Sequence, residues 1–336
     1  MTRIAPDALE ALAAAALERA GASPPMAQTS ARYLVLADLQ GIGTHGVARV
    51  PQYASHLRAG RVKGDAVPRV AREKGAACLI DAGDGLAFPA CARAAAEATA
   101  RARAHGIGIG ATCNSHHSGA IAAFLLDAAA AGFVGLGFSN AGAAIVPWGG
   151  SKPLFGTNPV AAVFPVRGGD PVVIDLSMTQ VTRGTIMLLA KQGKPVPEGW
   201  GMDADGRPTT DPQRILVGGS LNAVGGMKGT VLALVVQLLT SALTGAALSQ
   251  DIPSVHEAEG PPFRQGQCFV VIDPGALVGA DAYFDRVQTL VAAMLADEGV
   301  RLPGARRFAA AAAARRDGLD LSAALLQELR TLAGTS

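Results

Sequence analysis

The stretch His105-Gly-Ile-Gly-Ile-Gly-Ala-Thr-Cys113 decides the fold class of this 336-residue chain. Its residues 106–111 match G-x-G-x-x-A, the pattern of a dinucleotide-binding turn. That turn works where it follows a strand and opens a helix, because the pyrophosphate then meets the helix N-terminus. Here the motif follows an alanine-rich segment predicted to be helical over 89–105, and its alternating Ile and Gly residues predict a strand. We therefore favour a strand entered through glycine and a fold other than the Rossmann fold.

Strands and helices are predicted on both sides of this stretch, which indicates an α/β protein in the broad sense that includes α+β. Apolar runs predict further strands over 77–81, 134–138, 160–166, 172–176 and 267–273. Helical spacing predicts helices over 6–20, 26–39, 44–59, 120–131, 228–248, 280–298, 307–316 and 321–332. Arg167-Gly-Gly-Asp170 predicts a hairpin between two of the strands. The turn-rich segment 193–226 is predicted to be one long functional loop.

The composition excludes several classes of protein. With 49% hydrophobic residues, 17% charged residues and a net charge of +2, the chain is neither disordered nor built around a basic nucleic-acid surface. Its apolar runs fall short of the ~18 residues that span a membrane. The four cysteines form no C-x-x-C pair, and Asp7 stands where a signal peptide would be apolar. These features predict a soluble, cytoplasmic protein that binds neither nucleic acid nor membrane.

His45 and Arg49 are the first candidate catalytic residues, in the segment Gly41-Ile-Gly-Thr-His-Gly-Val-Ala-Arg49. On a helix, residues four apart share one face, so the two side chains would lie together. An imidazole can exchange a proton near neutral pH, and a guanidinium can bind a carboxylate with two hydrogen bonds. The pair suits reduction of a carbonyl beside a carboxylate. Spacing alone leaves open an alternative in which Thr44 caps the helix and both side chains are merely solvated.

His116 and His117 lie in Asn114-Ser-His-His-Ser-Gly119, between a predicted strand and the helix predicted over 120–131. The N–H groups at such a helix start can bind a phosphate or pyrophosphate. A metal site is the rival interpretation, but adjacent histidines rarely point at one ion, and the chain has no H-E-x-x-H motif. A hydrolase is disfavoured because no G-x-S-x-G motif occurs. We therefore predict an anion site and no metal.

A series of short strings follows in order along nearly the whole chain. The strings are Thr44-His-Gly-Val-Ala-Arg49, Asp81-Ala-Gly-Asp-Gly85, Asn114-Ser-His-His117, Pro147-Trp-Gly-Gly150, Phe155-Gly-Thr-Asn-Pro159, Val173-Ile-Asp-Leu-Ser177, Pro197-Glu-Gly-Trp200, Pro208-Thr-Thr-Asp-Pro212, Lys228-Gly229, Val271-Ile-Asp-Pro274 and Arg301-Leu-Pro-Gly304. Together they resemble the malate/L-lactate dehydrogenase family, which lacks a Rossmann fold. That family includes sulfolactate and ureidoglycolate dehydrogenases and Δ1-piperideine-2-carboxylate/Δ1-pyrroline-2-carboxylate reductases.

The resemblance implies an L-sulfolactate dehydrogenase-like fold with a mixed, largely antiparallel sheet flanked by helices. It implies that residues 1–115 together with 295–336 form a helical, substrate-binding and dimerisation region, and that 116–294 form an NAD(P)-binding sheet domain. The implied partners are a small carboxylate-bearing substrate and a second copy in a homodimer. NADP(H) is favoured over NAD(H), because the arginines over 301–307 are candidates for contacts with a 2′-phosphate.

The same resemblance implies roles for individual residues. His45 would donate the proton to the substrate, and Thr44 would replace a serine that orients the histidine. The implied substrate contacts are Arg49, which would bind the carboxylate, Thr157, Arg183 and Gly184. The implied cofactor contacts are His117, Ser118, Gly119, Ala120, Ile121, Asp175, Leu176, Ser177, Lys228, Arg301, Gly304, Arg306 and Arg307.

Three departures from the family's pattern bear on the substrate. Thr44 adds a methyl group, Gly43 stands where an acid is frequent, and Thr185 stands where ketimine reductases carry aspartate and many hydroxy-acid members carry lysine. Arg183-Gly184 and the loop Pro197-Glu-Gly-Trp200 resemble the sulfolactate-like branch. We therefore favour NAD(P)H-dependent interconversion of a 2-oxo acid and a 2-hydroxy acid, by hydride transfer with a protonated histidine as proton donor. The alternative is an NADPH-dependent reductase that converts a cyclic ketimine to pipecolate or proline.

Overall fold

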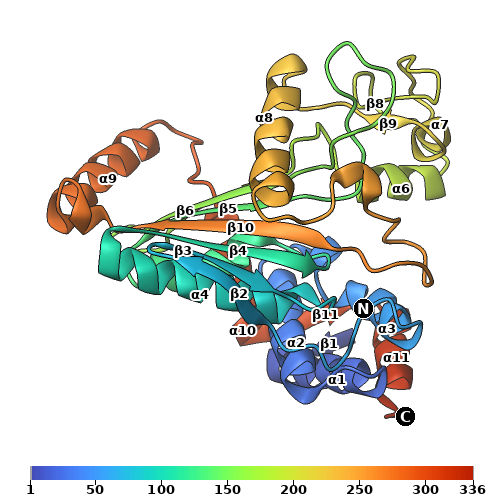
Figure 1. Cartoon of the computed structure of the whole chain (residues 1–336), viewed down its shortest axis with the longest axis horizontal. Helices are drawn as coiled ribbons and strands as arrows, with labels where there is room; N and C mark the ends of the chain where they lie inside the picture. Colours follow the sequence, from blue (N-terminus) through green and yellow to red (C-terminus); the bar gives the residue numbers. More distant parts are fainter. Residues whose placement is uncertain (1, 336) are drawn as a thin grey trace.

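A seven-stranded sheet crosses the middle of the molecule in Figure 1, which shows a computed structural model that describes residues 2–335. The strand order is β2-β3-β4-β10-β5-β6-β7, and only β3 and β4 pair in parallel. The strands are β2 (Arg69–Lys74), β3 (Ala77–Asp81), β4 (Ile107–Ser115), β10 (Gln265–Ile272), β5 (Val134–Ser139), β6 (Val160–Phe164) and β7 (Val172–Leu176). This sheet confirms the predicted α/β class, the largely antiparallel pairing and the hairpin between β6 and β7.

The stretch that matches the dinucleotide motif connects a helix to a strand. Helix α4 (Ala87–His105) ends at Gly106, whose φ of 81° is a left-handed conformation that glycine adopts without strain. A Cβ on Gly110 would collide with the carbonyl oxygen of Ala94 in α4, and Gly108 lies equally close to the same helix. The glycines therefore let α4 pack closely on β4, and the prediction of a strand entered through glycine is confirmed.

The two ends of the chain fold together on one side of the sheet (Figure 1). Their helices are α1 (Pro6–Arg19), α2 (Pro24–Leu39), α3 (Val50–Arg58), α10 (Ala305–Asp317) and α11 (Ala323–Ala333). A two-stranded sheet of β1 (Thr2–Ile4) and β11 (Leu319–Leu321) joins the two ends. The sequence did not predict it, because three-residue strands carry too little pattern. The largest hydrophobic core, rich in alanine, lies among α1–α4, η3 (Ile121–Leu125) and the sheet.

A smaller unit lies above one end of the sheet in Figure 1. It contains α6 (Arg183–Lys191), β8 (Gly201–Met202), α7 (Pro212–Leu216), β9 (Ser220–Leu221) and α8 (Met227–Gln237). Its own hydrophobic core includes Val181, Ile186, Val196, Ile215 and Leu221. The prediction of a single loop over 193–226 is wrong, because this core orders α7 and the β8–β9 pair within it.

Other boundaries also differ from the predictions. The helix predicted over 120–131 begins with the 3₁₀ turn η3 and only then becomes α5 (Leu126–Ala130). The helix predicted over 228–248 is α8 followed by one π-helical turn, Leu238–Ala242. Helix α9 (Ala280–Leu295) projects from the end of the sheet (Figure 1).

The division predicted at residues 115/116 falls at the end of β4, and the sheet takes strands from both sides of it. The terminal residues 1 and 336 of that prediction lie outside the described residues, and the division stays a prediction. Within residues 2–335, no helix has both the length and the apolar character needed to cross a membrane.

Candidate active site

His45 and Arg49 lie on two consecutive 3₁₀ turns rather than on one helix. The turns are η1 (Gly43–His45) and η2 (Val47–Arg49), and α3 begins directly after them. The expectation of a shared helix face is therefore wrong. The side chain of Arg49 nevertheless folds back onto η1, where its Nε donates a hydrogen bond to the backbone oxygen of Thr44 at 2.8 Å.

The side chain of Asp38 holds this double turn in place. It occupies the space that a Cβ on Gly46 would fill, so only glycine fits between the two turns. Its Oδ2 accepts a hydrogen bond of 2.7 Å from the N–H of Val47. Burial raises the pKa of Asp38 to about 6, and the hydrogen bond from Val47 opposes that shift. A tertiary contact from α2 thus overrides the local helical spacing.

His45 is surrounded by positive charge. Its Nδ1 and the hydroxyl of Thr44 share a hydrogen bond of 2.9 Å, and no described residue hydrogen-bonds its Nε2. Burial, followed by the charges of Arg49 and Arg307, lowers the pKa of His45 to about 4. A pKa of about 4 favours the neutral imidazole in the free site, and the protonated His45 expected from the sequence belongs to the reacting complex and stays a prediction. A bound anion beside the two guanidinium groups would raise the pKa of His45.

His117 and Tyr53 extend the site beyond His45. The rings of His117 and His45 are stacked, with centroids 5.7 Å apart and planes at 21°. The hydroxyl of Tyr53 and Nδ1 of His117 share a hydrogen bond of 2.6 Å. Burial raises the pKa of Tyr53, and burial together with the charge of Arg49 lowers that of His117, so the bond joins two neutral groups. Sequence analysis did not select Tyr53, although it lies four residues after Arg49.

The adjacent histidines 116 and 117 contact different partners. Nε2 of His116 and Nδ1 of His56 are 3.1 Å apart, and both rings are fully buried. His116 also packs edge-on against Phe263, at a centroid distance of 4.4 Å. In the part of the chain that the structure describes, no three His, Cys, Asp or Glu side chains are grouped as a metal site requires.

Three of the segments expected to contact a cofactor meet at Asp175. Its Oδ2 accepts hydrogen bonds from Nη1 of Arg307 at 3.2 Å and from the N–H of Ala122 at 3.4 Å. Nη2 of Arg307 donates to the backbone oxygen of Asp175 at 3.2 Å. Burial raises the pKa of Asp175, and Arg307 opposes that shift. The charge of Arg307 also lowers the pKa of His45, so the Arg307–Asp175 ion pair lies within electrostatic reach of the imidazole.

The loop before α10 lies against the edge strand β7. The N–H of Val173 donates to the backbone oxygen of Pro303 at 3.0 Å. Gly304 has a φ of 93°, and a Cβ there would lie 2.9 Å from the Cβ of Val173. Glycine is therefore needed for this close approach. Arg301 and Arg306, on either side of Gly304, are exposed and form no ion pair with any residue from 2 to 335.

The donor groups near Asp175 fit a phosphate-bearing nucleotide. The backbone N–H groups from Ser118 to Ile121 donate to no acceptor among the described residues, and Gly119 has a left-handed φ of 68°. Unpaired N–H groups at a helix start bind phosphate oxygens well, and the guanidinium of Arg307 adds a positive charge nearby. The residues present thus suit the pyrophosphate of a nicotinamide dinucleotide, without a glycine-rich turn.

The remaining expected site residues lie on neighbouring or more distant elements. Thr157 accepts a hydrogen bond at its backbone oxygen from the N–H of Met178 at 2.7 Å, which places it beside Ser177. Arg183 and Gly184 begin α6. Lys228 is exposed near the start of α8, and no described contact links it to His45.

Sequence analysis also missed His256, in the loop between η5 (Ser249–Asp251) and β10. Burial lowers the pKa of His256, and the charges of Arg49 and Arg183 lower it further. The only available signal was a histidine between two predicted elements.

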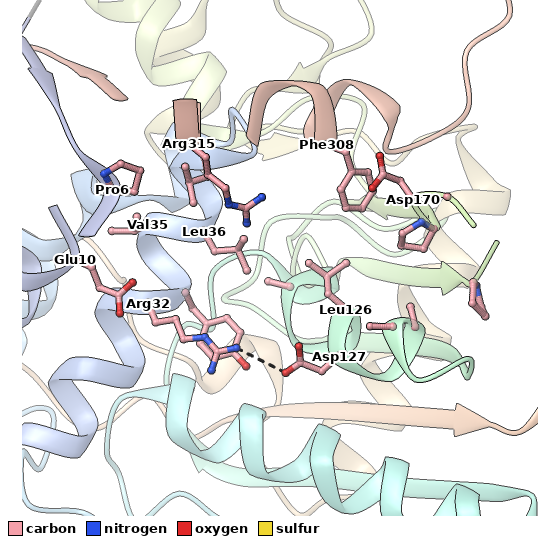
Figure 2. A pocket seen from close by; sticks show the side chains of 18 of the residues that line it. Pro6, Glu10, Arg32, Val35, Leu36, Leu126, Asp127, Asp170, Phe308 and Arg315 are labelled. Atoms are coloured by element: carbon pink, nitrogen blue, oxygen red, sulfur yellow. Dashed lines mark ion pairs between the residues drawn. The ribbon is translucent and has the colours of Figure 1, made fainter. Parts of the chain in front are cut away.

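A groove of about 1250 Å³ lies elsewhere in the molecule. Figure 2 shows its walls, which come from α1, α2, α5, α10 and the turn between β6 and β7. Arg32 and Asp127 form an ion pair of 3.7 Å there. None of the expected site residues lines this groove, so the candidate active site is the region around His45.

Comparisons with known proteins show which family the chain belongs to. The family model described as malate/L-lactate dehydrogenase matches residues 4–330. A (2R)-3-sulfolactate dehydrogenase (NADP(+)) from Chromohalobacter salexigens is 44% identical over 324 residues, which are 96% of each chain. A Delta(1)-pyrroline-2-carboxylate/Delta(1)-piperideine-2-carboxylate reductase from Pseudomonas putida is 38% identical over 97% of this chain and 95% of the relative.

Solved structures agree as well. The delta1-piperideine-2-carboxylate reductase from Pseudomonas syringae has a TM-score of 0.93 and 35% identity, covering 99% of this chain and 100% of that one. The sulfolactate dehydrogenase from Methanocaldococcus jannaschii has a TM-score of 0.91 and 27% identity, covering 100% and 98%. These findings confirm the resemblance seen in the sequence. The chain belongs to the malate/L-lactate dehydrogenase family of oxidoreductases.

Proposed function

We propose that this protein interconverts a 2-oxo acid and a 2-hydroxy acid with NADP(H) as the preferred cofactor. The observation that carries the proposal is His45, with its Nε2 unpaired among the described residues, flanked by Arg49 and by the Arg307–Asp175 pair. The 44% identity to a relative named as an NADP(+)-dependent sulfolactate dehydrogenase supports both the reaction and the cofactor. The exposed Arg301 and Arg306 are suited to bind a 2′-phosphate.

The residues around His45 have separate roles in the proposed reaction. A nicotinamide cofactor, when bound, supplies the hydride. Arg49 binds the substrate carboxylate, whose negative charge offsets the guanidinium charge that, after burial, lowers the pKa of His45. His45 then donates a proton to the substrate oxygen as negative charge develops there. Thr44 orients the ring through Nδ1, and His117 stacks against it.

A cyclic ketimine reductase is the second candidate, supported by the relative from Pseudomonas putida and the structural neighbour from Pseudomonas syringae. Thr185 does not separate the two candidates, because it is neither the aspartate of ketimine reductases nor the lysine of many hydroxy-acid members. Its N–H and hydroxyl both bond the hydroxyl of Thr182, at 3.2 and 3.0 Å, as part of the N-cap of α6. Neither the hydroxyl nor the N–H of Thr185 titrates near neutral pH, so Thr185 cannot take the place of a carboxylate in a proton relay.

We also propose that the protein acts as a homodimer in the cytoplasm. Helix α9 has no buried residue, and Leu290 and Leu295 on it are 62% and 50% exposed. Helix α8 exposes a second set of large apolar side chains, Val231, Leu232 and Val235 among them. A second copy that covers these faces would remove them from water. The four cysteines are unpaired thiols, which suits a reducing compartment.

The test is the oxidation of NADPH and NADH, followed by the loss of near-ultraviolet absorbance. The substrate panel contains pyruvate, oxaloacetate, sulfopyruvate, phenylpyruvate and Δ1-piperideine-2-carboxylate. We expect turnover of an open-chain oxoacid, faster with NADPH. Turnover of the cyclic imine alone would replace the first candidate by the second, and equal rates with both cofactors would remove the proposed preference.

A further inference from the structure

Helix α3 carries Tyr53 one turn after Arg49, at a position with no exposed surface. The Tyr53 ring packs edge-on against the rings of Phe88 and His116, at centroid distances of 6.0 and 5.3 Å. These two contacts fix the ring, and the ring in turn places its hydroxyl 2.6 Å from Nδ1 of His117. The site thus contains a buried hydroxyl group that has no role in the proposed reaction.

The segment that carries His117 is held on α3 at two neighbouring points. Tyr53 contacts His117, and one turn later Nδ1 of His56 lies 3.1 Å from Nε2 of the adjacent His116. Burial lowers the pKa of His56 to about 4, so this ring is neutral at pH 7. Its Nε2 lies 3.1 Å from the backbone oxygen of Glu257 and must carry the proton, because a carbonyl oxygen only accepts. His56 therefore accepts at Nδ1, and the hydrogen bonds determine which nitrogens are protonated.

The proton on His117 is assigned in the same way. Burial raises the pKa of Tyr53, so its hydroxyl keeps its proton, and His117 is the one hydrogen-bond partner of that hydroxyl among residues 2–335. If Nδ1 of His117 were the donor, the hydroxyl proton would be buried without an acceptor, which is costly. Tyr53 therefore donates to Nδ1. Since the pKa of His117 is lowered by burial, the ring is neutral and carries its own proton on Nε2.

Nε2 of His117 is a free donor beside His45. No described residue hydrogen-bonds to this nitrogen, and it is not one of the buried unpaired atoms, so a ligand can reach it. The two imidazole rings are stacked, with centroids 5.7 Å apart. A Cβ on Gly119 would lie 3.8 Å from the backbone oxygen of His45, so the segment after His117 also lies against His45. A neutral N–H at this position suits a neutral acceptor such as a carbonyl oxygen.

We propose that Tyr53 is a positioning residue that fixes the Nε2–H form of His117 and so presents a hydrogen-bond donor, beside His45, to a carbonyl oxygen of a bound ligand. This inference rests on the proposed function, in which the keto group of the oxoacid and the carboxamide of the nicotinamide both offer such an oxygen. Without the Tyr53 hydroxyl, the neutral ring could hold its proton on Nδ1 instead. Nε2 would then be an acceptor and would repel the carbonyl oxygen.

Nitrogen NMR of protein that is isotope-labelled at its histidine rings tests the assignment without any turnover. Protonated and unprotonated imidazole nitrogens have well-separated shifts, and a His117→Gln variant identifies the signals of this ring. At pH 7 we expect an unprotonated Nδ1 and a protonated Nε2 in wild type, and a mixture of the two forms in Tyr53→Phe. A wild-type ring that carries its proton on Nδ1, or a Tyr53→Phe ring with unchanged signals, would overturn the proposal.

Tyr33→Phe is the matched control for the loss of a tyrosine hydroxyl. Tyr33 is also buried and stacks on the same Phe88, at a centroid distance of 6.2 Å. Its hydroxyl forms no hydrogen bond with any residue from 2 to 335, and it does not contact His117. Tyr33→Phe should therefore leave the His117 signals unchanged.

Kinetics and binding test whether the donor is used. Tyr53→Phe keeps the ring that packs on Phe88 and His116, so its effect should be that of one neutral hydrogen bond, a loss of about 5-fold. The loss should appear in kcat/KM for the oxoacid if the keto oxygen accepts the bond, and in the dissociation constant of NADPH alone if the carboxamide accepts it. A folded Tyr53→Phe enzyme that loses neither would overturn the proposal.

A double-mutant cycle separates positioning of His117 from a general structural role of Tyr53. In the His117→Gln background, Tyr53→Phe should cost nothing more, because no imidazole proton is left to direct. The same loss of about 5-fold in that background would show that Tyr53 acts on the fold and not through His117, and would overturn the proposal. Thermal unfolding of each variant shows that it folds.

The NMR and NADPH-binding measurements also separate this inference from the proposed function. A protein that reduces no oxoacid, but in which Tyr53→Phe changes the protonation of His117 and weakens NADPH binding, would refute the reaction and keep the positioning role. Reduction of an oxoacid by a protein in which Tyr53→Phe leaves His117 unchanged would refute the positioning role alone.

Discussion

Replacing His45 by alanine should remove most of the activity while the fold persists. With a pKa of about 4, roughly one His45 in a thousand is protonated at pH 7 before an anion binds. The protonated form is therefore a strong acid but sparsely populated in the free site, and its contribution comes from the bound complex. A positioned general acid typically contributes 10²–10⁴ in rate, so kcat should fall about 100-fold or more, which corresponds to roughly 2.7 kcal/mol in the barrier.

The cost to folding should be small by comparison. His45 makes one side-chain hydrogen bond, to Thr44, so His45→Ala should lower stability by about 1 kcal/mol. The assay is steady-state NADPH oxidation, with NADPH binding measured by nicotinamide fluorescence and folding by thermal unfolding. His105→Ala, at an exposed histidine of α4, serves as the control. Near-normal turnover in a folded His45→Ala variant would remove the imidazole from the mechanism.

The same reasoning predicts how the pH affects the two directions of the reaction. Reduction needs protonated His45 and oxidation needs the neutral form. Since the neutral form prevails above about pH 4, kcat/KM for reduction should fall as the pH rises from 6 to 8, and oxidation of the 2-hydroxy acid should change little. Profiles measured in both directions check this, and reduction that is independent of pH over that range would contradict the assignment.

Further predictions concern the carboxylate contact, the helix–strand packing and the buried histidines. Arg49→Ala should mainly raise KM for carboxylate substrates, and an unchanged KM in the same NADPH assay would transfer the role to Arg183. Gly110→Ala forces a Cβ into the backbone of α4 and should cost about 2 kcal/mol or more in urea unfolding, whereas Gly142→Ala, whose Cβ would meet its nearest atom at 3.6 Å, should be nearly neutral. Burial lowers the pKa values of His56 and His116, so the unfolded chain takes up more protons below pH 6.5 and stability should fall with pH from there, by roughly 2 kcal/mol per buried histidine at pH 5. Unfolding midpoints that do not change between pH 7 and pH 5 would contradict this.

The sequence predicted the architecture where local pattern and tertiary demand agree. The alternating Ile and Gly residues over 106–110 predict a strand from local pattern. The folded chain needs the same glycines, because α4 packs closely against them. The prediction failed at His45 and Arg49, where the spacing is helical but Asp38 from another helix imposes two 3₁₀ turns. The prediction of one long loop over 193–226 failed for a related reason. The short elements in this segment are ordered by a small hydrophobic core and not by their own periodicity.

The candidate site was predictable as a set of segments but not as an arrangement. His117, Asp175 and Arg307 were selected separately from family strings, and only the folded chain shows that Asp175 and Arg307 pair within reach of His45. His256 could not be selected at all. The backbone of the loop that carries it is held by Gln52 and Arg61, which lie about 200 residues away in sequence and leave no local signal.

The most direct test of the central claim is the identity of the product. Wild-type protein would be incubated with NADPH and the best oxoacid of the panel, and the mixture analysed by mass spectrometry alongside the absorbance record. We expect one 2-hydroxy acid to form for each NADPH oxidised, and His45→Ala to form almost none in the same time. Oxidation of NADPH without a matching 2-hydroxy acid, or equal product from the variant, would contradict the proposed reaction and the role of His45.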